Sequence, residues 1–181
     1  MAEILLSSEA FVKSVTSASD NLSGKYILPS LREAQEIGLR GILGDDLLDK
    51  LKDLRKGGTL DTESGGVYKT LVDRCQYYLA YETITDVVNV VSFKVGNFGV
   101  TKTQDENLQV ATQDEIAKMR YYYRSKADAY CLDLQNFLLE HRKDYPELTE
   151  CGCHKIESNL RSAASCGIFL GGGRGKILPR R

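Results

Sequence analysis

The sequence lacks several features that usually mark a chain's function. Its 181 residues contain no tryptophan, only two histidines and three prolines, and the net charge is −1. So small a net charge gives no global field that would favour wholesale binding to nucleic acid or to a membrane. No run approaches the roughly 20 apolar residues of a membrane-spanning helix, and the start has no basic region of the kind that opens a signal peptide. We therefore expect a soluble protein that binds no membrane.

The cysteines indicate a reducing environment. They number five, they are spread over separate segments, and a chain of this size can build a core without disulfides. Cys151, Cys153 and His154 suggest a zinc site, with Cys166 or His141 as the fourth ligand. Structural zinc sites usually space two cysteines as Cys-x-x-Cys, whereas this cluster is tighter and has no second pair at regular spacing. We expect neither a metal nor another cofactor.

Catalytic patterns are missing as well. Residues 171–176 resemble a phosphate-binding loop only superficially, because Leu170 stands where its first glycine belongs and Ile177 where its hydroxyl belongs. The sequence has no Gly-x-Ser-x-Gly nucleophile motif, and no nucleophile pairs with either histidine in a recognisable pattern. We therefore expect a protein that is not an enzyme.

The segment 112–141 predicts the longest helix, around which we expect the rest to be organised. Thr112 and Glu115 form a capping box at its start, and Pro146 lies just beyond its end. At 1.5 Å per residue the helix would be about 45 Å long. Apolar residues recur in steps of three and four along one face: Ile116, Met119, Tyr123, Ala127, Tyr130, Leu134, Phe137, Leu138 and His141.

Shorter helices are predicted in the first third of the chain. Residues 1–22 form a docked N-terminal segment, in which Ser7 or Ser8 caps a short helix with Phe11, Val12 and Val15 on its buried side. Residues 25–39 form an amphipathic helix that ends near Gly38 and has a buried stripe of Ile27, Leu28, Leu31, Ala34 and Ile37. A tight connection at 41–44 leads to a helix from Asp45 or Asp46 to Lys56, which Gly57 and Gly58 terminate.

A second long helix is predicted over 67–93. Its most buried line is expected to contain Leu71, Cys75, Tyr78, Ile84, Val88 and Val91. Apolar residues cover much of the remaining circumference, so we expect this helix to be buried on several sides, in part by neighbouring subunits.

Residues 94–103 predict a β-hairpin, with Gly96-Asn97 suited to a two-residue turn. An isolated hairpin is only marginally stable in water. We therefore expect it to contact another subunit through Val95, Asn97, Phe98 and Val100.

Residues 147–181 predict an extended C-terminal arm. Three consecutive glycines make this segment too flexible to fold alone, yet it carries apolar and cationic side chains that a solvated tail does not need. We expect the arm to bind a partner through Ile168, Phe169, Leu170, Arg174, Lys176, Ile177, Leu178, Arg180 and Arg181. The whole chain thus predicts a mainly α fold, a small helical bundle with two long helices, one β-hairpin and this arm. Residues 23–146 form its core.

The order of these parts resembles a known family. Residues 31–47 read LREAQEIGLRGILGDDL, residues 77–81 read YYLAY, residues 98–100 read FGV, and Tyr145-Pro146 ends the last long helix. This ordered set, over about residues 25–146, is similar to the head–tail connector (adaptor) proteins of tailed phages, especially those of phages and prophages of Bacteroides-type gut bacteria. Many members have proline where Gly41 stands, and the tail from Glu150 onward matches no motif of that family.

The resemblance implies a structural virion protein in the neck, assembled in the host cytoplasm. It implies a homo-oligomeric ring, twelve-fold, that docks on the portal protein, contacts a neighbouring tail or stopper protein and surrounds genomic DNA without sequence specificity. The alternative is a helical nucleic-acid-binding or regulatory protein that uses its basic C-terminal tail. A steep salt dependence of DNA affinity is expected only for that alternative.

Overall fold

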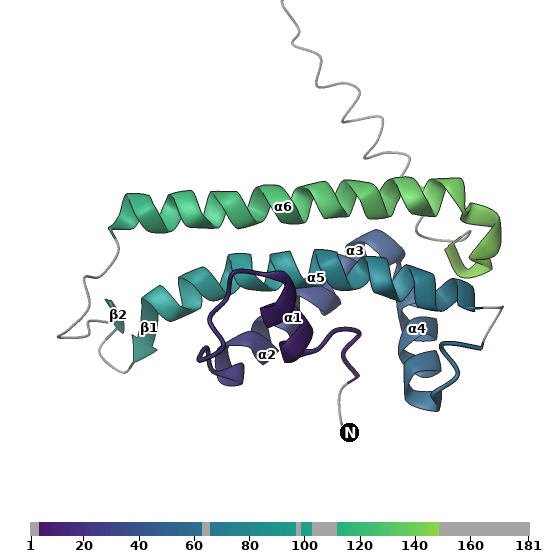
Figure 1. Cartoon of the computed structure of the whole chain (residues 1–181), viewed down its shortest axis with the longest axis horizontal. Helices are drawn as coiled ribbons and strands as arrows, with labels where there is room; N and C mark the ends of the chain where they lie inside the picture. Colours follow the sequence, from purple (N-terminus) through teal and green to yellow (C-terminus); the bar gives the residue numbers. More distant parts are fainter. Residues whose placement is uncertain (1–3, 63–65, 97–98, 103–111, 149–181) are drawn as a thin grey trace, which may run out of the picture.

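A computed structural model describes residues 4–62, 66–96, 99–102 and 112–148. The described chain is mainly helical, and two long antiparallel helices run along its longest dimension (Figure 1). Helix α5 spans Val67–Ser92 and helix α6 spans Gln113–Glu140. Both confirm the long helices predicted from the sequence to within a residue at each end. No helix in the described part has the length and hydropathy of a membrane span.

Helix α6 begins at the predicted capping box. The Thr112 hydroxyl accepts a hydrogen bond from the Glu115 amide (3.3 Å), and the Thr112 amide donates to the Glu115 carboxylate (2.8 Å). From Tyr123 onward, where α6 packs on α5, every residue of the apolar stripe is buried except Tyr130 and His141, which are partly buried. Near the start of the helix the stripe is uncovered, since Met119 is 51% exposed.

Helix α5 lies in the middle of the fold. Helix α6 covers one side of α5. Helices α1 (Glu9–Val15) and α2 (Gly24–Glu33) pack against other parts of the α5 surface (Figure 1). Leu71, Leu79 and Ala80 are completely buried as a result. The prediction that this helix is buried on several sides is confirmed, with contacts from within the same chain.

The N-terminal segment docks through main-chain hydrogen bonds. Ser8 caps α1 by accepting from the Phe11 amide (3.2 Å), as predicted. Leu6 is fully buried, and its amide donates to the Gln35 side chain (2.8 Å). Its carbonyl accepts from Arg55 (3.0 Å) and Gln76 (2.9 Å). These bonds join the segment to three different helices.

The predicted helix over 25–39 is wrong at its second half. After α2 the chain forms a π-helical segment, η1 (Ala34–Leu39), whose wider turns rotate each residue by less than an α-helix does. In a regular helix Leu39 would lie about 120° from Ile27; the wider turns bring it back to the core, where it is fully buried. Ile37, predicted to be buried, is 68% exposed, and Leu28 is 45% exposed.

The helix also ends later than predicted. It does not stop at Gly38 but continues through α3 (Arg40–Leu43), so the segment 41–44, predicted as a tight connection, is helical up to Leu43. The chain breaks at Gly44, whose φ of 84° favours glycine. Helix α4 (Asp45–Gly57) then runs to Gly58, which is left-handed with φ 69°. The predicted start and stop of this helix are confirmed.

Two short strands follow α5 directly. β1 (Phe93–Gly96) pairs antiparallel with β2 (Gly99–Lys102), so that Phe93 lies opposite Lys102 and Val95 opposite Val100. Beyond α6, two 3₁₀ turns, η3 (Arg142–Asp144) and η4 (Pro146–Leu148), fold the chain back. There Tyr145 is fully buried, and its hydroxyl donates to the Val67 carbonyl (3.1 Å).

Candidate assembly surfaces

Most of the residues predicted to bind partners lie outside the described part of the chain. This applies to all nine of the arm, from Ile168 to Arg181, to Asn97 and Phe98 of the hairpin, and to Cys151, Cys153, His154 and Cys166 of the zinc hypothesis. Val95 and Val100 are brought together as neighbours across the two strands. Further candidate binding sites therefore come from the surfaces of the described helices.

An apolar groove runs between α5 and α6 at the end near the strands. Its walls are Ile84, Val87, Val88 and Val91 of α5 and Ile116, Met119 and Tyr123 of α6, and Ala18 and Leu22 also line it. The groove has a volume of about 350 Å³. Residues spaced by three and four share a helical face, so the core stripes of both helices continue into this groove. The shorter helices do not reach far enough to cover them.

Large apolar side chains are exposed at this end of the helix pair. Val90, Val91 and Met119 are 40%, 38% and 51% exposed, and Tyr121 is 76% exposed. Removing apolar surface from water contributes roughly 25 cal/mol per Å². Exposed large apolar side chains gathered near one end of a helix pair are typical of a protein interaction site.

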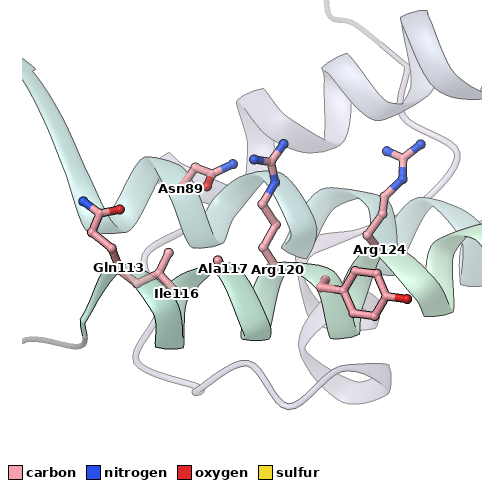
Figure 2. A pocket seen from close by; sticks show the side chains of 7 residues that line it. Asn89, Gln113, Ile116, Ala117, Arg120 and Arg124 are labelled. Atoms are coloured by element: carbon pink, nitrogen blue, oxygen red, sulfur yellow. The ribbon is translucent and has the colours of Figure 1, made fainter.

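A polar groove lies on the other side of the same helix end. Figure 2 shows Asn89 extending from α5, and Arg120 and Arg124 extending from α6 on one side of the helix pair. The groove has a volume of about 580 Å³. Arg124 pairs with Glu82 (2.8 Å) and Asp128 (3.1 Å). Arg120 makes no ion pair with any residue that the structure describes.

An acidic pocket lies where η1 faces α5. Its walls include Glu33, Ile37, Tyr78, Glu82 and Asp86, and its volume is about 310 Å³. Burial raises the pKa of Glu82, with Asp128 and Asp86 adding to the rise and Arg124 opposing it. Burial also raises the pKa of Tyr78.

The tyrosines form a stacked cluster at the middle of the helix pair. Tyr130 of α6 stacks between Tyr77 and Tyr81 of α5, with ring centroids 5.5 and 5.3 Å apart. Phe11 of α1 meets Tyr77 edge-on at 5.5 Å. Offset and edge-on aromatic pairs are favourable beyond their burial. The cluster therefore stabilises the subunit and fastens α1 to the long helices.

The three consecutive tyrosines of α6 divide as their spacing predicts. Tyr123 is buried (5% exposed), while Tyr121 and Tyr122 are 76% and 51% exposed. Tyrosine is favoured at protein interfaces, where an apolar ring and a polar hydroxyl both find partners. The two exposed rings add to the surface available for a partner near the start of α6.

An ion-pair cluster joins η1 to α4. The Glu36 carboxylate lies 2.6 Å from both Arg40 and Lys52, and Arg40 also reaches Asp45 (2.7 Å). Burial alone would raise the pKa of Glu36, but hydrogen bonds from Lys52, Arg40 and Gln35 lower it to about 2. These charged groups pair with one another, so the cluster stabilises the packing of η1 against α4 and is not a binding site.

The described residues offer no assembled catalytic or metal site. No group of three or more His, Cys, Asp or Glu among them is arranged to hold a metal ion. His141 lies at the end of α6, where its ring stacks on Phe137 and its Nδ1 lies 3.0 Å from the Phe137 carbonyl. Cys75 is completely buried, and this burial raises the pKa of its thiol, which keeps it protonated and unreactive.

Comparison with known proteins gives one family. Residues 39–158 match DUF6712, described as a family of unknown function. This range begins at the end of η1 and includes α4, α5 and α6, and with them the walls that α5 and α6 give to both grooves. No curated protein and no solved structure matches the chain.

Proposed function

Since the chain belongs to DUF6712, a family of unknown function, we propose its function from its sequence pattern and surfaces: it is a structural subunit of a phage head–tail connector. In this proposal the subunit forms a ring, twelve-fold, in the neck of the virion. The ring docks on the portal protein and extends the DNA channel toward the tail. It is assembled in the host cytoplasm and has no enzymatic activity.

The apolar groove carries the proposal. The core stripes of α5 and α6 continue into a surface that the chain itself leaves uncovered, with Met119 51% exposed. A subunit whose packing is completed by copies of itself presents such a surface on one face and fills it with another face of its neighbour. Repetition of that heterologous contact closes a ring.

The strands and the C-terminal arm supply the remaining contacts in this proposal. The hairpin pairs with or packs against adjacent subunits next to the apolar groove, because β1 follows α5 directly. The arm inserts into the portal or into a neighbouring tail or stopper protein. Its apolar residues provide buried anchors and its four cationic residues provide charge pairs.

In this proposal, contact with genomic DNA depends only on the positive charge of arginine side chains. Arg120 is directed into the polar groove, beside the partly neutralised Arg124 (Figure 2). Arginine contacts to phosphate position a protein on DNA but carry no sequence information. The channel contact is therefore weak and without sequence specificity.

The arm's role can be tested by truncation. A chain ending at Cys166 should lose binding to the cognate portal while keeping its helical circular dichroism spectrum and melting temperature. Portal binding is measured by surface plasmon resonance with both chains. If the truncated chain binds the portal as tightly as the full chain does, the arm is not the portal contact.

Arg120, which makes no ion pair with a residue that the structure describes, also favours a second function, a helical nucleic-acid-binding protein that uses the basic tail. The logarithm of its affinity for duplex DNA would then fall steeply with the logarithm of the salt concentration, by about 0.9 per phosphate neutralised. A connector would show weak affinity and a shallow slope.

A further inference from the structure

The acidic pocket contains a buried polar atom that lacks a hydrogen-bond partner. Glu82 Oε2 is buried and accepts no hydrogen bond in the described structure, although Oε1 pairs with Arg124. The Tyr78 hydroxyl lies nearby, against Gly38 in the pocket wall. Leaving a buried carboxylate oxygen unsatisfied is costly. A ligand that donates hydrogen bonds would satisfy it.

The negative charge of the pocket favours a cationic ligand. Glu33, Glu82 and Asp86 bring three carboxylates, against the single positive charge of Arg124. Asp86 also accepts a hydrogen bond from Ser30 (2.6 Å), which fixes its orientation. An ammonium or guanidinium group has several donors and no acceptor, so it complements these oxygens. The described acidic groups are not arranged to hold a metal ion.

An exposed apolar side chain at the rim of the pocket indicates which groups should accompany the cation in the ligand. Ile37 lines the pocket and is 68% exposed, because the π-turn rotates it out of the core. A ligand with a cation followed by aliphatic side chains would pair the cation with the carboxylates and cover Ile37. The chain carries this pattern in Lys176-Ile177-Leu178, and no acidic residue follows Glu157.

The length of the chain allows this segment to reach the pocket of its own subunit. Along α6, Arg124 at the pocket and Glu140 at the helix end are about 24 Å apart. Residues 149–176 number 28, and a flexible chain of 28 residues has an r.m.s. end-to-end distance of about 30 Å. Matching lengths give an effective concentration in the millimolar range.

We propose that residues 176–178 of the C-terminal arm dock in the acidic pocket of the same chain. Lys176 donates to Glu82 and the neighbouring carboxylates, and Ile177 and Leu178 cover Ile37. This docking concerns the free subunit and does not depend on ring formation. It holds the arm on the subunit at a site outside the apolar groove.

Zero-length carbodiimide cross-linking of the full chain tests the docking. The reagent joins an ammonium group to a carboxylate in direct contact, so Lys176 should link to Glu33, Glu82 or Asp86, as read by mass spectrometry of tryptic peptides. Lys155, the other lysine beyond residue 148, is the internal control and should not link to them. In a mixture of ¹⁴N and ¹⁵N chains, the linked peptides should carry a single isotope.

Two matched arm variants separate docking from chance contact. Leu178→Asp removes the apolar contact with Ile37 and should lower the yield of the Lys176 links about tenfold. Leu170→Asp, equal in chemistry but outside the docked residues, should leave the yield unchanged. The proposal is overturned if Lys176 forms no such link, if about half of the links in an equal mixture join chains of different isotope, or if both variants behave alike.

Discussion

Gly38 lies where the π-turn of η1 meets the buried side chain of Tyr78. A Cβ added at this position would collide with the Tyr78 hydroxyl, the rigid end of an aromatic ring that is 6% exposed. By contrast, a Cβ at Gly41, in α3, would meet nothing within 4 Å. The two glycines are three residues apart in one continuous helical segment, so they form a matched pair.

We therefore expect Gly38→Ala and Gly41→Ala to have opposite effects. Gly41→Ala should stabilise the chain by about 0.5–1 kcal/mol, since alanine favours helix. Gly38→Ala should destabilise it by about 1 kcal/mol, because the cost of overpacking exceeds that gain. Urea unfolding measures both. In a Gly38→Ala background, Tyr78→Phe should recover most of the loss; if it does not, the hydroxyl is not the cause.

Glu36 makes stability depend on pH in a defined direction. Its pKa of about 2 in the folded chain lies below the ordinary value of 4.5. A carboxyl group with a lowered folded pKa contributes stability that is present above its unfolded pKa and is lost as the pH falls from about 4.5 to 2. The group is partly exposed to solvent, which reduces the contribution to about 1 kcal/mol.

Glu36→Gln should therefore be less stable than the parent chain at pH 7 by about 1 kcal/mol, and the difference should be less than half as large at pH 3. Denaturant unfolding at the two pH values gives this comparison. Asp53→Asn is the control, since Asp53 is exposed on α4 and makes no ion pair with a described residue. A difference for Glu36→Gln that is the same at both pH values would contradict the account.

At the scale of elements, the π-helical segment η1 decides which side chains of the first third face the core. A π-turn holds one residue more than an α-turn over the same rotation. Ile37, which is 68% exposed, contributes little to the core. Its deletion can convert η1 to regular α-helix and still leave Leu39 and Ile42 facing inward.

We expect the Ile37 deletion to fold, with a cooperative thermal transition and a helix content close to that of the parent. Deletion of Asp73, exposed in the regular helix α5, is the matched comparison. It should abolish cooperative unfolding, because it rotates the two halves of α5 by about 100° relative to each other. Thermal melting followed by circular dichroism distinguishes the two deletion variants. Equal damage from both deletions would show that η1 does not hold an extra residue.

Local patterns in the sequence were sufficient to predict α4, α5 and α6. The capping box at Thr112, the left-handed Gly58 and the apolar steps of three and four each act within a few residues. The π-turn could not be predicted, because periodicity assumes a constant rotation per residue. Nor could the burial of Gln35, which depends on its bond to Leu6, 29 residues earlier.

The sequence predicted incomplete packing at α5, at the hairpin and at the arm. The structure also leaves uncovered the groove beside Met119 of α6. The stripe of α6 already contained this residue. What the sequence could not show is how far α1 and α2 extend along the long helices, since that depends on tertiary packing. The acidic pocket depends on the same long-range contacts.

At the scale of the whole molecule, the helix pair has an uncovered apolar end. The proposed connector uses it for association of subunits, and two exposed residues of α6 test this location. Met119, in the apolar groove, is 51% exposed, and Leu132, outside the groove, is 48% exposed. A charge at either position alters the surface of the monomer similarly, yet only Met119→Asp places it in the groove.

The most direct test is electron microscopy of the purified full chain, alone and with its cognate portal protein, for the parent, Met119→Asp and Leu132→Asp. If the apolar groove joins the subunits, the parent and Leu132→Asp should form closed rings, and Met119→Asp should remain as dispersed subunits. Single subunits of the parent at every concentration, with no density added to the portal, would contradict the account.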